Sequence, residues 1–224
     1  STQAKTLFPY TTLFRSQEVR NKIARDLHDD IGSTLGSIHL YSQVANAKIH
    51  KTGNTEIASI LKKIEDGSQE IIGKTSDAIW VAKSEHDQTR DLIWKMENYC
   101  ASLLGAAGIG FAIHHDPKIE SLRLKMDQRK NLFLIFKEAI HNIIKYSKAG
   151  EVQITLSKNG NFLSLTISDN GTGFTTSEMR SGGNGLNNMK QRAIDSGGSF
   201  DISSPLGLGT TIVVRFPIHT TQFW

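Results

Sequence analysis

Hydrophobic residues recur at helical spacing in two long stretches near the start of the chain. In residues 20–49 the recurring positions are Ile23, Leu27, Ile31, Leu35, Ile38, Ala45 and Ile49. In the second stretch they are Ile57, Leu61, Ile64, Ile71, Ala78 and Ile79. Steps of three and four residues place each set on one face of an α-helix. Gly53 and Asn54 interrupt the pattern, so residues 17–82 are predicted to form an antiparallel helical hairpin.

The predicted hairpin has a histidine at the edge of its hydrophobic face. That face requires a second helical surface to cover it. Two helices cannot cover their own hydrophobic faces, and a second copy would complete a four-helix bundle, so we predict a homodimer. His28 directly follows Leu27, which places its ring at the edge of the predicted seam, within reach of solvent. Asp29 is next to it, and an imidazole beside a carboxylate is a plausible nucleophile. A spacer helix with an ordinary surface histidine fits this segment equally well.

The remaining pattern alternates between helices and strands after a polar linker at residues 83–90. Helical spacing runs from Asp91 to about Gly105, and again from about Asp127 to Ser147 and from about Leu186 to Ser196. Strand patterns are GFAIHH, EVQITLS, FLSLTIS, SFDIS and TTIVVRFP, and Asn159-Gly160 is a strong hairpin signal. Residues 91–218 are therefore predicted to form an α/β sandwich, with helices on one face of a mostly antiparallel sheet and residues 219–224 as a tail.

Composition narrows the function classes. The formal net charge of +4 over 224 residues comes from dispersed Lys and Arg, so we expect no direct nucleic-acid binding. The single cysteine, Cys100, excludes an internal disulfide, and the lack of an apolar run of about 18 residues predicts no membrane contact by this stretch. Residues 6–16 read as the codon-by-codon translation of a common sequencing adaptor. We therefore expect residues 1–16 to be a disordered assembly artefact.

The stretch FKEAIHNIIKYSKA offers metal and phosphate ligands on one helix face. Spacings of four and three residues place Glu138, Asn142 and Lys145 together. The residues expected to face the core are Phe136, Ala139, Ile143 and Ile144. A carboxylate, an amide and an ammonium can hold a hydrated Mg²⁺ and the phosphates attached to it. An ordinary solvated polar face is the alternative.

The stretch SDNGTGF follows a strand directly. Asp169 ends that strand, and Gly171 and Gly173 let the backbone approach a ligand closely. A carboxylate in this place can accept a hydrogen bond from an exocyclic amine such as that of adenine. The alternative is a hairpin turn, because Asp-Asn-Gly is also turn chemistry.

Two further glycine-containing stretches follow. In SGGNGLNNMKQRA, glycines lead straight into a helix, which places free backbone N–H groups beside a possible phosphate. The stretch fits neither the P-loop nor the dinucleotide fingerprint. In LGLGTTIVVRF, Thr210 and Thr211 open a strand, where their hydroxyls could hold a base through water. Each of these stretches alone also fits an ordinary turn or the start of a strand. Their order along the chain strengthens the interpretation that together they form one binding site.

Together the four stretches resemble the asparagine box, the two glycine boxes and the closing Gly-Thr-Thr of the GHKL (Bergerat) ATP-binding fold. RNKIARDLHDDIG resembles the phosphoacceptor helix of bacterial two-component sensor histidine kinases. Within that family it is similar to the class that usually signals to response regulators with a helix-turn-helix output. The resemblance covers residues 17–218 and implies a dimeric helical hairpin followed by an ATP-binding α/β sandwich.

The resemblance also implies roles for individual residues. His28 matches the phosphorylated histidine, Asp29 the acid that orients or deprotonates it, and Glu138 the acidic catalytic residue one turn before the asparagine. Asn142, with Glu138, matches the Mg²⁺-binding position. The positions implied to bind ATP are Asn142, Lys145, Asp169, Gly171, Gly173, Gly183, Gly185, Leu186 and Thr210.

The implied function is ATP-dependent autophosphorylation of His28, followed by transfer to an aspartate of a response regulator, at the cytoplasmic side of the cell. A GHKL-fold ATPase that drives conformational change and an inactive dimeric scaffold are the alternatives. Three positions depart from the family pattern. Ser33 stands where many relatives carry a glutamine linked to dephosphorylating the regulator, Tyr146 replaces a frequent histidine, and Ser84 replaces a proline.

Overall fold

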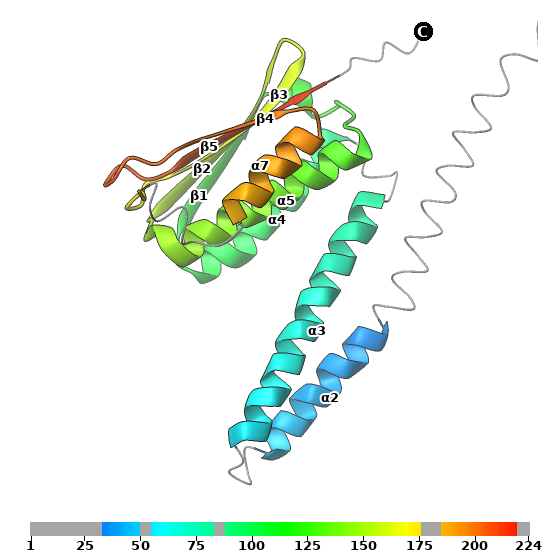
Figure 1. The fold of residues 1–224 in the computed structure, drawn as a ribbon. Coiled ribbons are helices and arrows are strands. Elements are labelled where there is room, and N and C mark those ends of the chain that lie inside the picture. Colours follow the sequence, from blue (N-terminus) through cyan, green and yellow to red (C-terminus); the bar gives the residue numbers. More distant parts are fainter. Residues whose placement is uncertain (1–32, 50–54, 83–87, 176–184, 219–224) are drawn as a thin grey trace, which may run out of the picture. The chain divides into compact units, whose positions relative to one another are not determined.

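The computed structural model describes residues 33–49, 55–82, 88–175 and 185–218 (Figure 1). The chain divides into two compact units, residues 1–86 and residues 87–224. The predictions for residues 1–16, for the linker at 83–87 and for the tail at 219–224 fall outside the described residues. None of the described helices is both long and apolar enough to cross a bilayer.

The first unit is a helical hairpin, as predicted. Helix α2 spans Ser33–Ile49 and the longer helix α3 spans Thr55–Ala82, and α2 packs against part of α3 (Figure 1). The part of the first predicted helix before Ser33 lies outside the described residues. Among the described residues of the hairpin, the buried hydrophobic side chains are Ala58 and Ile79.

Much of the predicted hydrophobic face is exposed in the single chain. The exposed large hydrophobic side chains of the hairpin are Ile38, Leu40, Tyr41, Val44, Ile57, Ile60, Ile64 and Ile71. Those of α3 recur at steps of three, four and seven residues, the spacing of one helix face. Contiguous exposed hydrophobic surface of this kind is typical of an interaction face.

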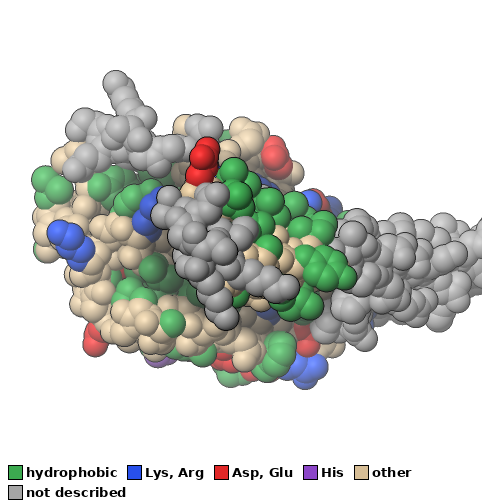
Figure 2. Space-filling view, turned by 90° about the horizontal axis from the view of Figure 1, so that it is seen from below, with side chains coloured by type: hydrophobic (Ala, Val, Ile, Leu, Met, Phe, Trp, Pro, Cys, Tyr) green, Lys and Arg blue, Asp and Glu red, His purple; other side chains and the backbone are tan. Residues whose placement is uncertain are grey.

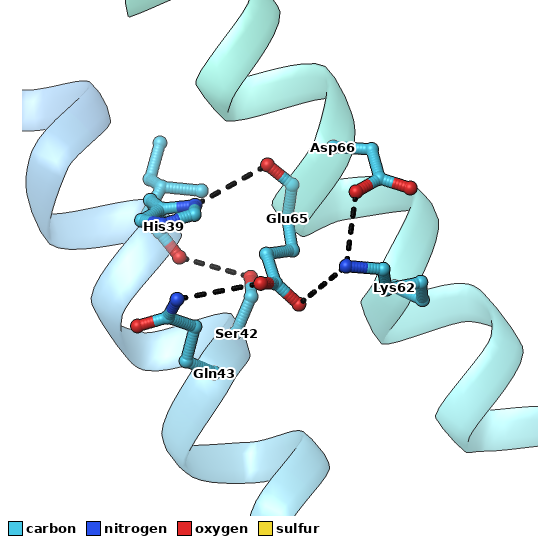
Figure 3. Close-up of polar contacts among 7 residues, drawn as sticks. His39, Ser42, Gln43, Lys62, Glu65 and Asp66 are labelled. Carbon is cyan, nitrogen blue, oxygen red and sulfur yellow. Dashed lines mark hydrogen bonds and ion pairs between the residues drawn. The ribbon is translucent and has the colours of Figure 1, made fainter. Parts of the chain in front are cut away.

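Polar side chains join the two helices near the middle of the hairpin (Figure 3). The Nδ1 atom of His39 lies 3.3 Å from the backbone oxygen of Glu65, and Gln43 Nε2 donates to Glu65 Oε1 at 3.3 Å. On α3 itself, the Lys62 ammonium lies 3.5 Å from Glu65 and 3.2 Å from Asp66. One carboxylate therefore receives contacts from both helices.

The second unit is a five-stranded sheet with helices on one face, which confirms the predicted α/β sandwich (Figure 1). The strands are β1 (Gly110–His115), β2 (Glu151–Asn159), β3 (Phe162–Asp169), β4 (Ser199–Ser203) and β5 (Thr211–Pro217). Their order is β1-β2-β3-β5-β4, and only the β1–β2 pair is parallel. The helices are α4 (Thr89–Ala106), α5 (Met126–Asn142) and α7 (Gly185–Asp195), with a short 3₁₀ turn η3 at Pro117–Ile119.

Alternation along the strands explains the two layers. In β2, Val152, Ile154 and Leu156 are buried, whereas Gln153 and Thr155 between them are exposed. Such a period of two puts one set of side chains under the helices and the other in solvent. The core side chains of α4 and α5 with at most 1% exposure include Leu92, Met96, Leu104, Leu132, Phe133, Phe136 and Ile140.

Two boundaries differ from the sequence prediction. Helix α4 begins at Thr89 rather than Asp91, because the Thr89 amide and hydroxyl both donate to the carbonyl of Leu122, at 2.8 and 3.0 Å. The predicted helix over residues 127–147 is an α-helix only to Asn142, and continues as the π turn η4 (Ile143–Ser147). The wider turn shifts side chains away from the 3.6-residue period, so Ile144 is exposed, and its predicted place in the core is wrong.

Candidate functional site

The structure describes most of the predicted site residues. Glu138 and Asn142 of α5, Thr210, and Leu186 of α7 are half-buried, Asp169 is buried, and Lys145 is exposed. His28, Asp29 and Gly183 lie outside the described residues. The contacts below show which of the four predicted stretches come together.

The asparagine-containing helix meets the start of the last helix. Gly185 opens α7, and a Cβ atom there would overlap Oε1 of Glu138. The Glu138 carboxylate therefore lies directly beside the amino end of α7, where the helix dipole favours negative charge. This contact joins the first and third predicted stretches.

The π turn that follows Asn142 holds the first glycine-containing segment. The carbonyl of Ser147 accepts a hydrogen bond from the amide of Thr172 at 2.8 Å, and a Cβ atom on Gly171 would overlap that same carbonyl. The Ser147 hydroxyl donates to Ile143 O at 2.8 Å and fixes the turn. Lys148 ends it in the left-handed region at φ 55°. The first and second stretches are therefore in backbone contact.

Asp169 is held in a buried position at the end of β3. Its Oδ1 accepts a hydrogen bond from the amide of Gly171 at 2.8 Å, and its own amide donates to the carbonyl of Thr210 at 2.9 Å. Burial raises the pKa of the carboxyl above its usual range, and the backbone N–H groups of Gly171 and Thr210 oppose that rise. A carboxylate fixed in this way presents its remaining acceptor capacity in one direction.

The loop between β4 and β5 packs against the same segment through glycines. Gly209 has φ 79°, and a Cβ atom on it would overlap the carbonyl of Asp169. Gly173 has φ 63°, and a Cβ atom there would overlap the carbonyl of Pro205. Both positions combine a left-handed backbone with a close approach that only glycine permits. The second and fourth stretches are thus in direct contact, so that pairwise contacts connect all four stretches.

The side chains fit a Mg²⁺ ion that is held jointly with phosphates. Glu138 and Asn142 supply oxygen ligands, which suit this ion. Within the described parts of the chain, no three His, Cys, Asp or Glu side chains gather closely enough to hold a metal by themselves. A magnesium ion here would therefore complete its coordination with phosphate oxygens and water. The Lys145 ammonium lies 5.1 Å from the centre of the Tyr146 ring, and its role as a phosphate contact stays a prediction.

Sequence reasoning missed three residues that hold these stretches together, namely Ser147, Asn170 and Ser204. Asn170 Oδ1 accepts hydrogen bonds from the amides of Gly150 and Glu151, at 2.9 and 3.0 Å. Ser204 Oγ accepts from the amide of Phe174 at 3.0 Å. Serine and asparagine are ordinary turn residues, so the sequence gives no sign of these roles.

Two family models match the chain, and each matches one of its two parts. The model described as "Histidine kinase" (HisKA_3) matches residues 19–97, which include His28 and the hairpin. The model described as "Histidine kinase-, DNA gyrase B-, and HSP90-like ATPase" (HATPase_c) matches residues 127–220, which include all four stretches.

Individual relatives agree with these matches. The chain is 26% identical over 215 residues to the sensor histidine kinase LiaS of Bacillus subtilis, and covers 56% of that protein with 92% of its own length. It is 27% identical over 207 residues to the sensor protein VraS of Staphylococcus saprophyticus, with 91% and 56% covered. The chain thus spans little more than half the length of these relatives.

Solved structures share the fold. A blue-light activated histidine kinase of Erythrobacter litoralis matches with a TM-score of 0.59 at 14% identity, over 86% of this chain and 61% of that one. The histidine kinase AdeS of Acinetobacter baumannii matches with a TM-score of 0.54 at 15% identity, over 86% and 98%. The chain belongs to the two-component sensor histidine kinases, of which it carries the catalytic core.

Proposed function

We propose that this chain uses ATP to phosphorylate His28 and that the phosphoryl group then passes to an aspartate of a response regulator. The observation that carries the proposal is the set of pairwise contacts that connects all four ATP-fold stretches, in one chain with a hairpin that matches the histidine kinase model. The buried, oriented carboxylate of Asp169 is the proposed reader of adenine. Gly171, Gly173, Gly183, Gly185, Leu186 and Thr210 are the proposed lining of the nucleotide site.

The proposed reaction is an in-line displacement at the γ-phosphorus of ATP. The lone pair of one His28 ring nitrogen forms the new P–N bond while the bond to the β,γ-bridging oxygen breaks, and ADP leaves with that electron pair. Asp29 accepts a hydrogen bond from the other ring nitrogen, which fixes the tautomer and stabilises the developing positive charge. Glu138 and Asn142 would hold Mg²⁺, which when bound offsets phosphate charge.

The proposed partners follow from the same chemistry. A second copy of the chain would cover the exposed faces of α2 and α3, and a receiver domain would supply the acceptor aspartate. We place the reaction on the cytoplasmic side, where ATP and response regulators are found.

The decisive experiment is labelling of the purified chain with γ-³²P ATP. Wild type should acquire phosphate that is labile in acid and stable in base, as a phosphohistidine is, and His28→Gln should acquire none. His39→Gln is the matched control, because His39 lies on the same predicted helix and should label normally. Undiminished labelling of His28→Gln would refute His28 as the acceptor. Release of inorganic phosphate without labelling would instead indicate a plain ATPase. Absence of both labelling and phosphate release would indicate an inactive scaffold.

The nucleotide site has its own test. Asp169→Asn should abolish ATP binding measured by calorimetry. The one acceptor oxygen of asparagine would stay with the Gly171 amide, so its NH₂ group, which cannot accept a hydrogen bond, would face adenine. Asp201→Asn is the matched control, since Asp201 is exposed and pairs with Arg215 at 2.6 Å on β4 and β5. Retained binding by Asp169→Asn would contradict the assigned pocket.

A further inference from the structure

Ser204 belongs to the second unit, residues 87–224, which we call the nucleotide unit. It lies where the loop between β4 and β5 meets the segment SDNGTGF. It directly follows β4 and is half-buried. Its Oγ accepts a hydrogen bond from the amide of Phe174 at 3.0 Å and lies 2.8 Å from Oγ1 of Thr210. The Ser204 hydroxyl thus contacts both the segment that contains Asp169 and Thr210, whose own hydroxyl is proposed to contact the base.

The two segments that Ser204 joins run closely beside each other. The amide of Gly207 donates to the carbonyl of Thr172 at 2.8 Å, and the amide of Asp169 donates to Thr210 O at 2.9 Å. These backbone contacts fix the path of both segments, but leave the Thr210 hydroxyl free to rotate about its Cα–Cβ bond. The contact with Ser204 is what selects one orientation of that hydroxyl.

The hydrogen-bonding capacity of a serine explains why this contact would matter to a ligand. The amide of Phe174 uses one lone pair of Ser204 Oγ, and the hydroxyl proton of Ser204 can be donated to Thr210 Oγ1. With Ser204 as the donor, the Thr210 hydroxyl keeps its own proton for an acceptor in the site, such as a ring nitrogen of a base or a bridging water.

We propose that Ser204 is a positioning residue of the nucleotide site, which orients the Thr210 hydroxyl beside Asp169. This inference rests on the proposed function, since it assumes that the site binds ATP. It goes beyond it by assigning a role in binding to a residue that the family resemblance did not mark.

A second hydroxyl pair in the same strands provides a matched control. Ser168 Oγ lies 2.9 Å from Thr211 Oγ1, and these residues are the direct neighbours of Asp169 and Thr210. Because side chains alternate along a strand, this pair lies on the opposite face of the sheet. Loss of either pair should cost similar stability, but only loss of the Ser204 contact should change nucleotide binding.

The test measures ATP affinity and melting temperature of the full chain. Ser204→Ala should weaken ATP binding by roughly threefold to tenfold, the loss expected for one to two hydrogen bonds. Autophosphorylation at saturating ATP should stay near wild type, so KM rises while kcat is retained. Ser204→Thr, which keeps a hydroxyl, should recover most of the affinity. Ser168→Ala should leave ATP affinity unchanged while lowering the melting temperature by as much as Ser204→Ala.

A double variant completes the test. If Ser204 acts through Thr210, Ser204→Ala combined with Thr210→Val should bind ATP no more weakly than Thr210→Val alone. The inference is overturned if Ser204→Ala binds ATP as wild type does, if Ser168→Ala weakens binding equally, or if the two losses simply add. Failure of the wild-type chain to bind ATP would instead overturn the proposed function, so the two failures are distinguishable.

Discussion

The two units of the chain handle their hydrophobic residues in opposite ways. In the nucleotide unit the core side chains of α4 and α5, such as Leu92 and Phe136, lie under the sheet with almost no exposure. In the hairpin, by contrast, four isoleucines of α3 (Ile57, Ile60, Ile64 and Ile71) remain 42–50% exposed. Hydrophobic side chains also reach the surface in groups between charged ones (Figure 2). The difference teaches that one unit closes its core within the described chain, while the other exposes a hydrophobic face, which we propose that a second copy of the chain covers.

The largest expected effect breaks the closed core. Phe136 is fully buried and its ring lies 6.0 Å from Phe133 and 5.8 Å from Tyr99. Phe136→Ala should lower the free energy of unfolding of the nucleotide unit by about 3–5 kcal/mol, because a cavity replaces the ring. Urea unfolding followed by fluorescence measures it. The loss should be independent of protein concentration, and a concentration-dependent loss would mean that this core is not closed within one chain.

The next largest effect addresses the open face of the hairpin. Ile64 is 42% exposed on α3, and Ile64→Asp should weaken the proposed homodimer by about a hundredfold or more, since a charge would then be buried between chains. Sedimentation velocity over a dilution series measures the dissociation. Ile194→Asp is the matched control, because Ile194 is 51% exposed on α7 of the other unit and should leave the dimer intact. Equal dissociation of the Ile64→Asp and Ile194→Asp variants would contradict the proposal that the hairpin, and not the nucleotide unit, carries the dimer interface.

The helices and strands of both units could be predicted from the sequence. Helical and strand periods depend on residues close in the chain, such as Val152, Ile154 and Leu156 of β2. The order of glycines and the positions of Glu138, Asn142 and Asp169 gave the candidate site, because that order is specific to one fold. The roles of these residues, like those of His28, Asp29 and Gly183 outside the described residues, stay predictions.

The features that the sequence did not predict depend on contacts between distant segments. The π turn after Asn142 is stabilised where Ser147 O meets Thr172, 25 residues later in the chain. The link from Ser204 to Phe174 spans 30 residues and uses a residue type common in any turn. The exposure of Ile144 follows from the π turn and could not be read from a period of 3.6 residues. Local sequence patterns predict helices and strands, but they do not predict these contacts between distant segments.

A smaller effect tests the site within the closed unit. Because burial raises the pKa of Asp169, the folded state binds a proton more readily than the unfolded state does, and ionised Asp169 costs stability above its folded pKa. Asp169→Asn should therefore melt at or above the wild-type temperature at neutral pH without nucleotide. That advantage should shrink as the pH falls through the raised pKa toward 3.8, the ordinary value. Calorimetric scans across this range check it, and a lower melting temperature at neutral pH would contradict it.

The smallest expected effect concerns the polar contacts inside the hairpin (Figure 3). Gln43 Nε2 and Glu65 Oε1 are 3.3 Å apart and exposed to water, which competes for both groups. A double-mutant cycle with Gln43→Ala and Glu65→Ala should therefore give a coupling energy below about 0.5 kcal/mol. The exposed Arg215–Asp201 pair of the other unit should give a similarly small value, since exposure rather than location sets its strength. A coupling energy of about 2 kcal/mol in the hairpin alone would mean that polar contacts, rather than hydrophobic packing between α2 and α3, hold the two helices together.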